Sequence, residues 1–303
     1  MGDGNETSTT GRPPAIEIRR LTKEYPLPGG RSRVRAVDDL SLTVPTGTVY
    51  GLLGPNGSGK STTLKALLGL LRPTRGECLI AGVPGADPAS HRSIGYLPEA
   101  PYFPKHLSGR ELVRYHARLC DLPRAGREER IAALLERVGL TRAADRRIGG
   151  YSKGMLQRIG LAQALVSDPP ILILDEPTAG VDPVGAAEIA ELILEQKRRG
   201  CTVLLCSHFL TQIEEICDRV AILHRGRMLA EGSLEELLGR GERQALVVDS
   251  LPECEVAAFR AWLAERGARF HGIETPSARL DRFFLSAVVA AEQSAQSAVE
   301  VRQ

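Results

Sequence analysis

Short runs of apolar residues divide the chain at regular intervals. The runs at residues 49–53, 171–174 and 203–206 are apolar without alternation, which is typical of strands buried on both faces of a sheet. Between residue 16 and about residue 239, such runs alternate with segments of helical periodicity. This alternation predicts a mainly parallel sheet covered by helices, and therefore an α/β fold class.

A helical insertion is predicted at about residues 105–167. Ser108 and Glu111 match a capping box ahead of Leu112. Apolar positions then recur at helical spacing at Ile131, Leu134, Leu135 and Val138. Residues 105–158 contain thirteen Lys or Arg against six Asp or Glu. Two interpretations of this excess stay open: a solvated helical face, which is the more ordinary one, or a surface facing an anionic membrane or a partner.

The ends of the chain differ in character from its middle. Residues 1–14 are small and polar, which predicts a disordered lead. Residues 15–240 form the predicted main domain. Ser233 and Glu236 are placed to cap a short helix near its end. Residues 241–303 are predicted to form a small C-terminal α+β accessory domain, to which we assign no chemistry.

Composition and charge narrow the classes of protein. A hydrophobic share of 43% with 25% charged residues is ordinary for a soluble globular protein. With a net charge of +2 and only 4% aromatic residues, no nucleic-acid partner is expected. The six cysteines show no C-x-x-C pair and no zinc-site spacing, which favours inert thiols in a reducing cytosol.

Targeting and membrane signals are not evident in the sequence. The N-terminus lacks the apolar core of a signal peptide. The longest uncharged apolar stretch, near residues 283–291, is about half of what a membrane-spanning helix needs. We therefore expect any membrane role to come through a partner.

A phosphate-binding motif follows the first of the buried strands. Residues 54–61 fit G-x-x-x-x-G-K-[ST] between a strand and a helix, which is the context that this motif requires. Its glycines let the backbone N–H groups approach a phosphate closely, at the positive end of the helix. Lys60 supplies a cation for the outer phosphates and the Ser61 hydroxyl can bind Mg²⁺. The predicted nucleotide-binding residues here are Gly54, Pro55, Asn56, Gly57, Ser58, Gly59, Lys60, Ser61 and Thr62.

Two further strands end in groups suited to phosphate chemistry. Asp175 and Glu176 follow the run at 171–174, at the edge where open α/β sheets bind ligands. Asp175 is predicted to join the Mg²⁺ shell, and Glu176 to polarise the water that attacks the γ-phosphorus. His208 follows the run at 203–206 and is predicted to contact the γ-phosphate.

Together these motifs resemble those of ATP-binding-cassette (ABC) transporter ATPases, over roughly residues 16–240. The resemblance implies that Tyr25 stacks on adenine. It also assigns Ser152 and Gly154, in the signature variant Tyr-Ser-Lys-Gly-Met, to the γ-phosphate of a second subunit's ATP. After Tyr96-Leu97-Pro98, Glu99 stands where the family has a hinge glutamine, so it can bind Mg²⁺ but carries an extra charge. Residues 179–182 resemble the loop that links the two subunits' sites.

The family resemblance implies a fold and a mechanism. It implies a P-loop NTPase core with an N-terminal antiparallel β portion and an inserted helical subdomain. ATP and Mg²⁺ are the implied cofactors, and ATP hydrolysis is the implied activity. Two cassettes, most simply a homodimer, would sandwich ATP and drive a separately encoded membrane permease from the cytoplasmic face of the membrane. The signature variant and the Tyr-Leu-Pro-Glu hinge are similar to cassettes of prokaryotic exporters.

Other classes of function remain alternatives. One is a soluble ABC ATPase that remodels a macromolecular complex; it would usually have two cassettes or long coiled coils, which this sequence lacks. A regulatory switch with little hydrolysis is another, against which Glu176 and His208 argue. A small-molecule P-loop kinase would lack the signature. The cargo and the role of the C-terminal segment are not determined by the sequence.

Overall fold

The computed structural model describes residues 13–27, 32–207, 210–238 and 252–266. Within these residues, one sheet is antiparallel, with the order β2-β1-β4-β5. Its strands are β1 (Ile16–Pro26), β2 (Arg33–Val44), β4 (Arg75–Ile80) and β5 (Val83–Pro84). The second sheet has the order β10-β9-β3-β8-β7-β6 and is mainly parallel. Its strands are β3 (Val49–Leu53), β6 (Ile94–Leu97), β7 (Ile171–Asp175), β8 (Thr202–Ser207), β9 (Arg219–His224) and β10 (Arg227–Ser233).

The predicted double burial of the central strands is confirmed. Every residue of β3, β7 and β8 is buried. Their side chains alternate between two hydrophobic clusters: Leu53, Leu172 and Leu205 belong to the one that includes the helical insertion. Leu52 and Leu204 belong to the other, which includes β1, β2 and the helix α1 (Lys60–Leu67). The mainly parallel sheet is thus the layer between two cores, and the predicted α/β class is correct.

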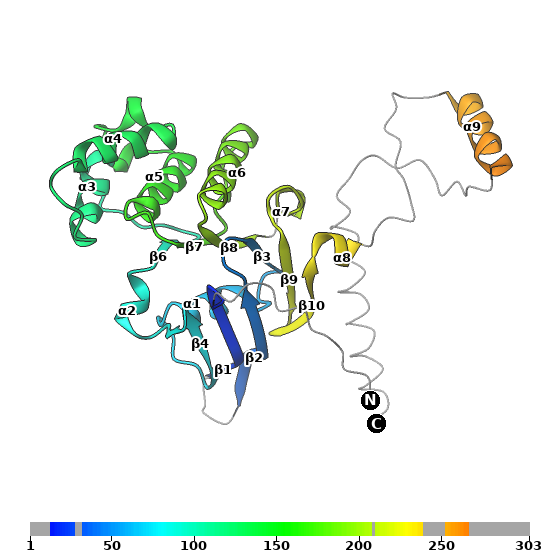
Figure 1. The fold of residues 1–303 in the computed structure, drawn as a ribbon, viewed down its shortest axis with the longest axis horizontal. Coiled ribbons are helices and arrows are strands. Elements are labelled where there is room, and N and C mark those ends of the chain that lie inside the picture. Colours follow the sequence, from blue (N-terminus) through cyan, green and yellow to red (C-terminus); the bar gives the residue numbers. More distant parts are fainter. Residues whose placement is uncertain (1–12, 28–31, 208–209, 239–251, 267–303) are drawn as a thin grey trace.

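Helices gather at one side of the molecule, next to β6 and β7 (Figure 1). They are α3 (Gly109–Leu119), α4 (Arg127–Arg137) and α5 (Lys153–Leu165), with α6 (Pro183–Arg198) beside them. The capping box is confirmed, because the Ser108 N–H donates to Glu111 Oε2 at 2.8 Å and the Glu111 N–H donates to Ser108 Oγ at 3.2 Å. The periodic apolar residues at 131–138 are buried. The insertion is less continuously helical than expected, since Gly126 and Gly139, both with positive φ, lie at helix ends.

The remaining described helices are short or lie toward the C-terminus. They are α2 (Pro88–His91), α7 (Leu210–Ile216), α8 (Leu234–Leu238) and α9 (Glu253–Glu265). Ser233 and Glu236 cap α8 reciprocally, as predicted. Most of the predicted N-terminal lead and of the 241–303 module lies outside the described residues, so the division into domains stays a prediction. Among the residues described, no helix is both long and apolar enough to span a membrane.

Gly95 provides a test of how closely the helical insertion packs on the sheet. A Cβ on this β6 residue would lie 2.2 Å from the carbonyl oxygen of Ala164 in α5. Because backbone must move to make room, we expect Gly95→Ala to lower the free energy of unfolding by about 2 kcal/mol or more, measured by urea titration. Gly154→Ala is the matched control: its Cβ would find no atom nearer than 3.7 Å, so it should not destabilise. Equal stability of the two variants would contradict this packing.

Candidate functional site

The phosphate-binding motif forms a close backbone turn between β3 and α1. Gly54 and Gly59 have φ of 153° and 109°. A Cβ at Gly54 would lie 2.3 Å from the carbonyl oxygen of Leu223, and one at Gly59 would lie 2.7 Å from that of Ala36. These two positions therefore require glycine, both for backbone conformation and for space.

Two polar groups of the loop are held inside it. Lys60 is buried, and its Nζ donates to the carbonyl oxygens of Gly54 at 2.5 Å and Pro55 at 3.3 Å. Ser58 Oγ is buried without a hydrogen-bond partner among the described residues. A cation folded back on the loop and an unpaired buried hydroxyl both suit a site completed by a phosphate group.

The register of the parallel strands brings the predicted residues to one edge. Leu53 pairs with Ser207, and Asp175 pairs with Cys206, so β3, β8 and β7 end at the same level. Since neighbouring strands lie about 4.8 Å apart, the start of the phosphate loop and Asp175 are separated by the width of two strand spacings, roughly 10 Å. His208, which would follow Ser207 between them, lies outside the described residues.

Asp175 stands in an environment that disfavours its charge. The side chain is buried, and burial together with the carboxylates of Glu99 and Glu176 raises its pKa to about 6, against a lowering by Lys60. Such a cluster of acids fits a divalent cation, and carboxylate and hydroxyl oxygens are ligands that Mg²⁺ accepts. No group of three or more His, Cys, Asp or Glu in the described part of the chain could hold a metal by itself. The environment of Asp175 therefore fits a Mg²⁺ whose shell would be completed by other oxygen ligands and water.

Glu176 has an unusual backbone conformation. Its φ is 51°, in the left-handed region that non-glycine residues rarely adopt, and the residue is 6% exposed. The Glu176 N–H donates to the carbonyl oxygen of Cys206 at 2.9 Å, which fixes this turn to β8. Strained backbone that the surroundings hold in place is a common feature of functional sites. Neither the strain nor its anchor could be predicted from the sequence.

Glu99 is tied to the helix that carries the signature segment. It is exposed and follows β6. The buried Gln157 of α5 donates from Nε2 to the Glu99 carbonyl oxygen at 2.9 Å. One turn further along α5, a Cβ at Gly160 would lie 2.5 Å from Leu97 Cδ1, so the hinge segment packs closely on this helix. Our sequence analysis missed Gln157; its signal was a polar residue on an otherwise apolar helix face.

Ser152 and Gly154 lie apart from the phosphate loop. Ser152 is the N-cap of α5, and its Oγ accepts a hydrogen bond from the Met155 N–H at 3.3 Å. It is exposed, and Gly154 is half-buried. Within the described residues, no hydrogen bond joins either residue to the loop at 54–62. Because the first N–H groups of a helix have no partner within the helix, the start of α5 can offer donors to a ligand.

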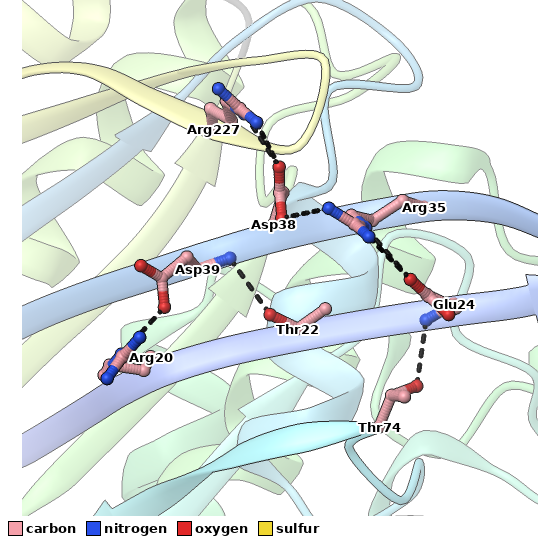
Figure 2. Close-up of polar contacts among 8 residues, drawn as sticks. All are labelled: Arg20, Thr22, Glu24, Arg35, Asp38, Asp39, Thr74 and Arg227. Atoms are coloured by element: carbon pink, nitrogen blue, oxygen red, sulfur yellow. Dashed lines mark hydrogen bonds and ion pairs between the residues drawn. The ribbon is translucent and has the colours of Figure 1, made fainter.

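Asp38 links the antiparallel sheet to β10, since its carboxylate lies between Arg35 and Arg227 (Figure 2). The Asp38 carboxylate binds Arg227 at 2.6 Å and Arg35 at 2.9 Å, and these cations, Arg227 foremost, hold its pKa below the usual value. The Asp38 N–H donates to the Gly226 carbonyl oxygen at 2.8 Å, and the Gly226 N–H donates to that of Ser58 at 2.9 Å. The turn between β9 and β10 therefore connects β2 to the loop.

Tyr25 lies on the strand next to this connection. It pairs with Val34, two residues from Ala36, whose carbonyl oxygen meets Gly59. Because a strand rises about 3.4 Å per residue, Val34 and Ala36 lie roughly 7 Å apart along β2. The ring is 38% exposed, with Lys23 Nζ 5.2 Å from its centroid. Tyr25 thus offers an accessible aromatic surface near the loop.

The raised pKa of Asp175 predicts a pH-dependent stability. The folded state binds this proton more tightly than the unfolded chain, so its contribution is full below pH 4 and is lost as the pH rises through about 6. In a chelator, Asp175→Asn should raise the free energy of unfolding at pH 8 by about 2 kcal/mol, and the gain should shrink toward pH 5.

Asp182→Asn provides the control for this titration. The hydrogen bond from the Gly185 N–H lowers the pKa of Asp182, so the charged form of Asp182 stabilises the folded state. Asp182→Asn is therefore expected to give no gain in the free energy of unfolding at pH 8. Urea titrations of both variants from pH 5 to pH 8 make the comparison. A pH-independent effect of Asp175→Asn would contradict the charge cluster described above.

Comparisons with known proteins agree with this geometry. A family model described as ABC transporter matches residues 37–179. The uncharacterized ABC transporter ATP-binding protein sll0415 of Synechocystis sp. is 41% identical over 242 residues, or 79% of this chain and 68% of that protein. The fluoroquinolones export ATP-binding protein MT2762 of Mycobacterium tuberculosis is 40% identical, over 77% of this chain and 75% of that protein. A dimeric post-hydrolysis structure of the ATP-binding cassette MJ0796, bound to ADP and Pi, matches with a TM-score of 0.67 at 26% identity, over 72% and 98% of the two chains. This chain belongs to the ABC transporter ATP-binding protein family.

Proposed function

We propose that this protein hydrolyses MgATP in a head-to-tail dimer and thereby drives export through a separately encoded membrane permease. The observation that supports the proposal is that the predicted site residues fall into two groups. The phosphate loop, Asp175 and Glu176 follow strand ends at one edge of the sheet, while no hydrogen bond among the described residues joins the exposed Ser152 or Gly154 to that loop. A second copy of the chain supplies the missing half.

Each group in the site has a proposed role. The backbone N–H groups of the loop from Asn56 to Thr62 and the Lys60 ammonium bind the phosphates of ATP, and Tyr25 stacks on adenine. Ser61 and Asp175 hold Mg²⁺, with Glu99 within electrostatic reach of Asp175, and this ion neutralises charge on the phosphate oxygens. Glu176 orients and deprotonates the attacking water, and His208 donates to the γ-phosphate.

The partner's signature segment completes the site around the γ-phosphate. The N-terminus of α5 offers the N–H groups that follow Ser152, together with the positive end of a 13-residue helix. A Cβ at Gly154 would meet nothing within its own chain nearer than 3.7 Å, so the space above it is open to a partner. ATP then stabilises the closed dimer, and hydrolysis removes that preference.

Coupling to the permease passes through the hinge segment. The Gln157–Glu99 hydrogen bond joins α5 to a residue whose charge acts on Asp175. Beside it lies a groove of about 270 Å³, lined among others by Pro98, Tyr102 and Tyr115. Tyr102 is 88% exposed, and the buried Oε1 of Gln163 in the groove wall has no partner among the described residues. A largely apolar groove with an unpaired acceptor in its wall fits a short helical segment of the permease.

The names of relatives support the proposed direction of transport. MT2762 is named as an export protein, and the Tyr-Leu-Pro-Glu hinge is similar to those of exporter cassettes. We place the protein at the cytoplasmic face of the cell membrane as a peripheral subunit.

Glu176→Gln tests the proposed base and the dimer together. We expect steady-state ATP hydrolysis by the purified chain to fall by 10²- to 10⁴-fold, about the contribution of a general base. Because the amide still fits the site but cannot take the proton, the variant should accumulate as an ATP-bound dimer on gel filtration.

Glu136→Gln is the matched control. Glu136 is an exposed glutamate of α4, and this change removes the same charge far from the site. The Glu136→Gln variant should hydrolyse ATP at the native rate. Native-like hydrolysis by Glu176→Gln would refute the role of Glu176, and a monomer under all nucleotide conditions would refute the homodimer.

A further inference from the structure

The helical insertion contains a hollow that the proposed ATPase cycle does not use. It lies at the junction of α3 and α4, has a volume of about 500 Å³, and is lined by Arg118, Arg124, Arg127 and Glu128. Its one carboxylate is already bound, because Arg114 donates from Nε and NH2 to the two oxygens of Glu128, both at 2.7 Å. The hollow is therefore strongly positive.

These three arginines differ from the other arginines in and around the same helices in the groups that they bind. Elsewhere the guanidinium groups meet carboxylates, in the pairs Arg110–Asp145, Arg137–Glu195 and Arg158–Glu188. Within the part of the chain that the structure describes, Arg118, Arg124 and Arg127 form no ion pair. Arg127 donates to the Leu122 carbonyl oxygen, which shapes the loop at 120–126. Three guanidinium groups around one hollow, whose carboxylate is already bound by Arg114, suit the oxygens of a phosphate group.

The surface beside the hollow is apolar. Tyr115 and Leu119 lie one turn apart on α3, on either side of Arg118 in the sequence, and are 54% and 60% exposed. Tyr115 also lines the groove that we assign to the permease. Exposed aromatic and aliphatic side chains next to arginines are typical of surfaces that lie at the headgroup level of a bilayer.

We propose that the hollow lined by Arg118, Arg124 and Arg127 binds the phosphate of an anionic lipid headgroup, with Leu119 against the bilayer surface and Tyr115 at the edge of the permease groove. The proposal rests on the proposed permease, since docking at the neighbouring groove brings this face toward the membrane. It gives the basic excess of residues 105–158 a location and a ligand. The nucleotide-binding subunit would then respond directly to the lipid composition around its permease.

The test is co-sedimentation of the full chain, without nucleotide, with vesicles of phosphatidylcholine alone or mixed with phosphatidylglycerol. The variant is Arg118→Gln/Arg124→Gln, because both side chains are exposed and neither makes a hydrogen bond that shapes the fold among the described residues. The control is Arg75→Gln/Arg92→Gln, two exposed arginines that lie outside the helical insertion and whose loss changes the net charge equally.

We expect the native chain and the control to bind the anionic vesicles and not the neutral ones. The variant should bind on the order of 10- to 30-fold more weakly, since each arginine near an anionic surface contributes about a factor of five. Equal binding by variant and control, or no preference of the native chain for anionic vesicles, would overturn the proposal. Displacement of the vesicles by inorganic phosphate, at concentrations too low to screen charge, would also overturn it in favour of a soluble anion.

ATP hydrolysis in solution separates this inference from the proposed function. The double variant should keep the native rate, because neither arginine belongs to the nucleotide site. Loss of vesicle binding with intact hydrolysis is the expected pair of results. A chain that hydrolyses no ATP yet shows the arginine-dependent vesicle binding would refute the proposed function and leave the lipid site standing.

Discussion

The register of three buried parallel strands determines where the chemistry of this protein occurs. Because β3, β8 and β7 are covered on both faces, a shift of one residue would move every side chain into the wrong core. That constraint sets Leu53, Ser207 and Asp175 at one edge. The phosphate loop and the acidic pair follow from those ends, so the geometry of the site is a consequence of how the sheet is packed.

The charged side chains at this edge of the sheet are suited to binding a ligand. Burial of Asp175, together with the carboxylates of Glu99 and Glu176, raises its pKa to about 6, and Lys60 is drawn into the loop. In the proposed complex with MgATP, the metal would neutralise the acids and the phosphates would bind the lysine. Glu99 in place of an amide makes the acid cluster stronger. We therefore expect the hinge to respond to the metal more sharply than an amide hinge would.

Much of this arrangement could be predicted from local patterns in the sequence. The uninterrupted apolar runs identified the central strands, Ser108 and Glu111 identified a helix start, and the glycines at 54–59 identified the phosphate loop. Each of these depends on neighbours within a few residues. The link from Gln157 to Glu99 and the bond that holds the left-handed Glu176 to Cys206 are contacts between distant segments. Those contacts are fixed only when the two cores pack, so no local pattern reports them.

The central claim is that the site of one chain is completed by the signature of another. Mixing two inactive variants tests it most directly: Lys60→Met, with a defective phosphate loop, and Gly154→Asp, with a defective signature segment that the fold has room to accept. In a head-to-tail dimer, each mixed pair contains one site with an intact loop from one chain and an intact signature from the other. The account predicts that ATP hydrolysis reappears on mixing. Hydrolysis no greater than the sum of the separate variants would contradict it.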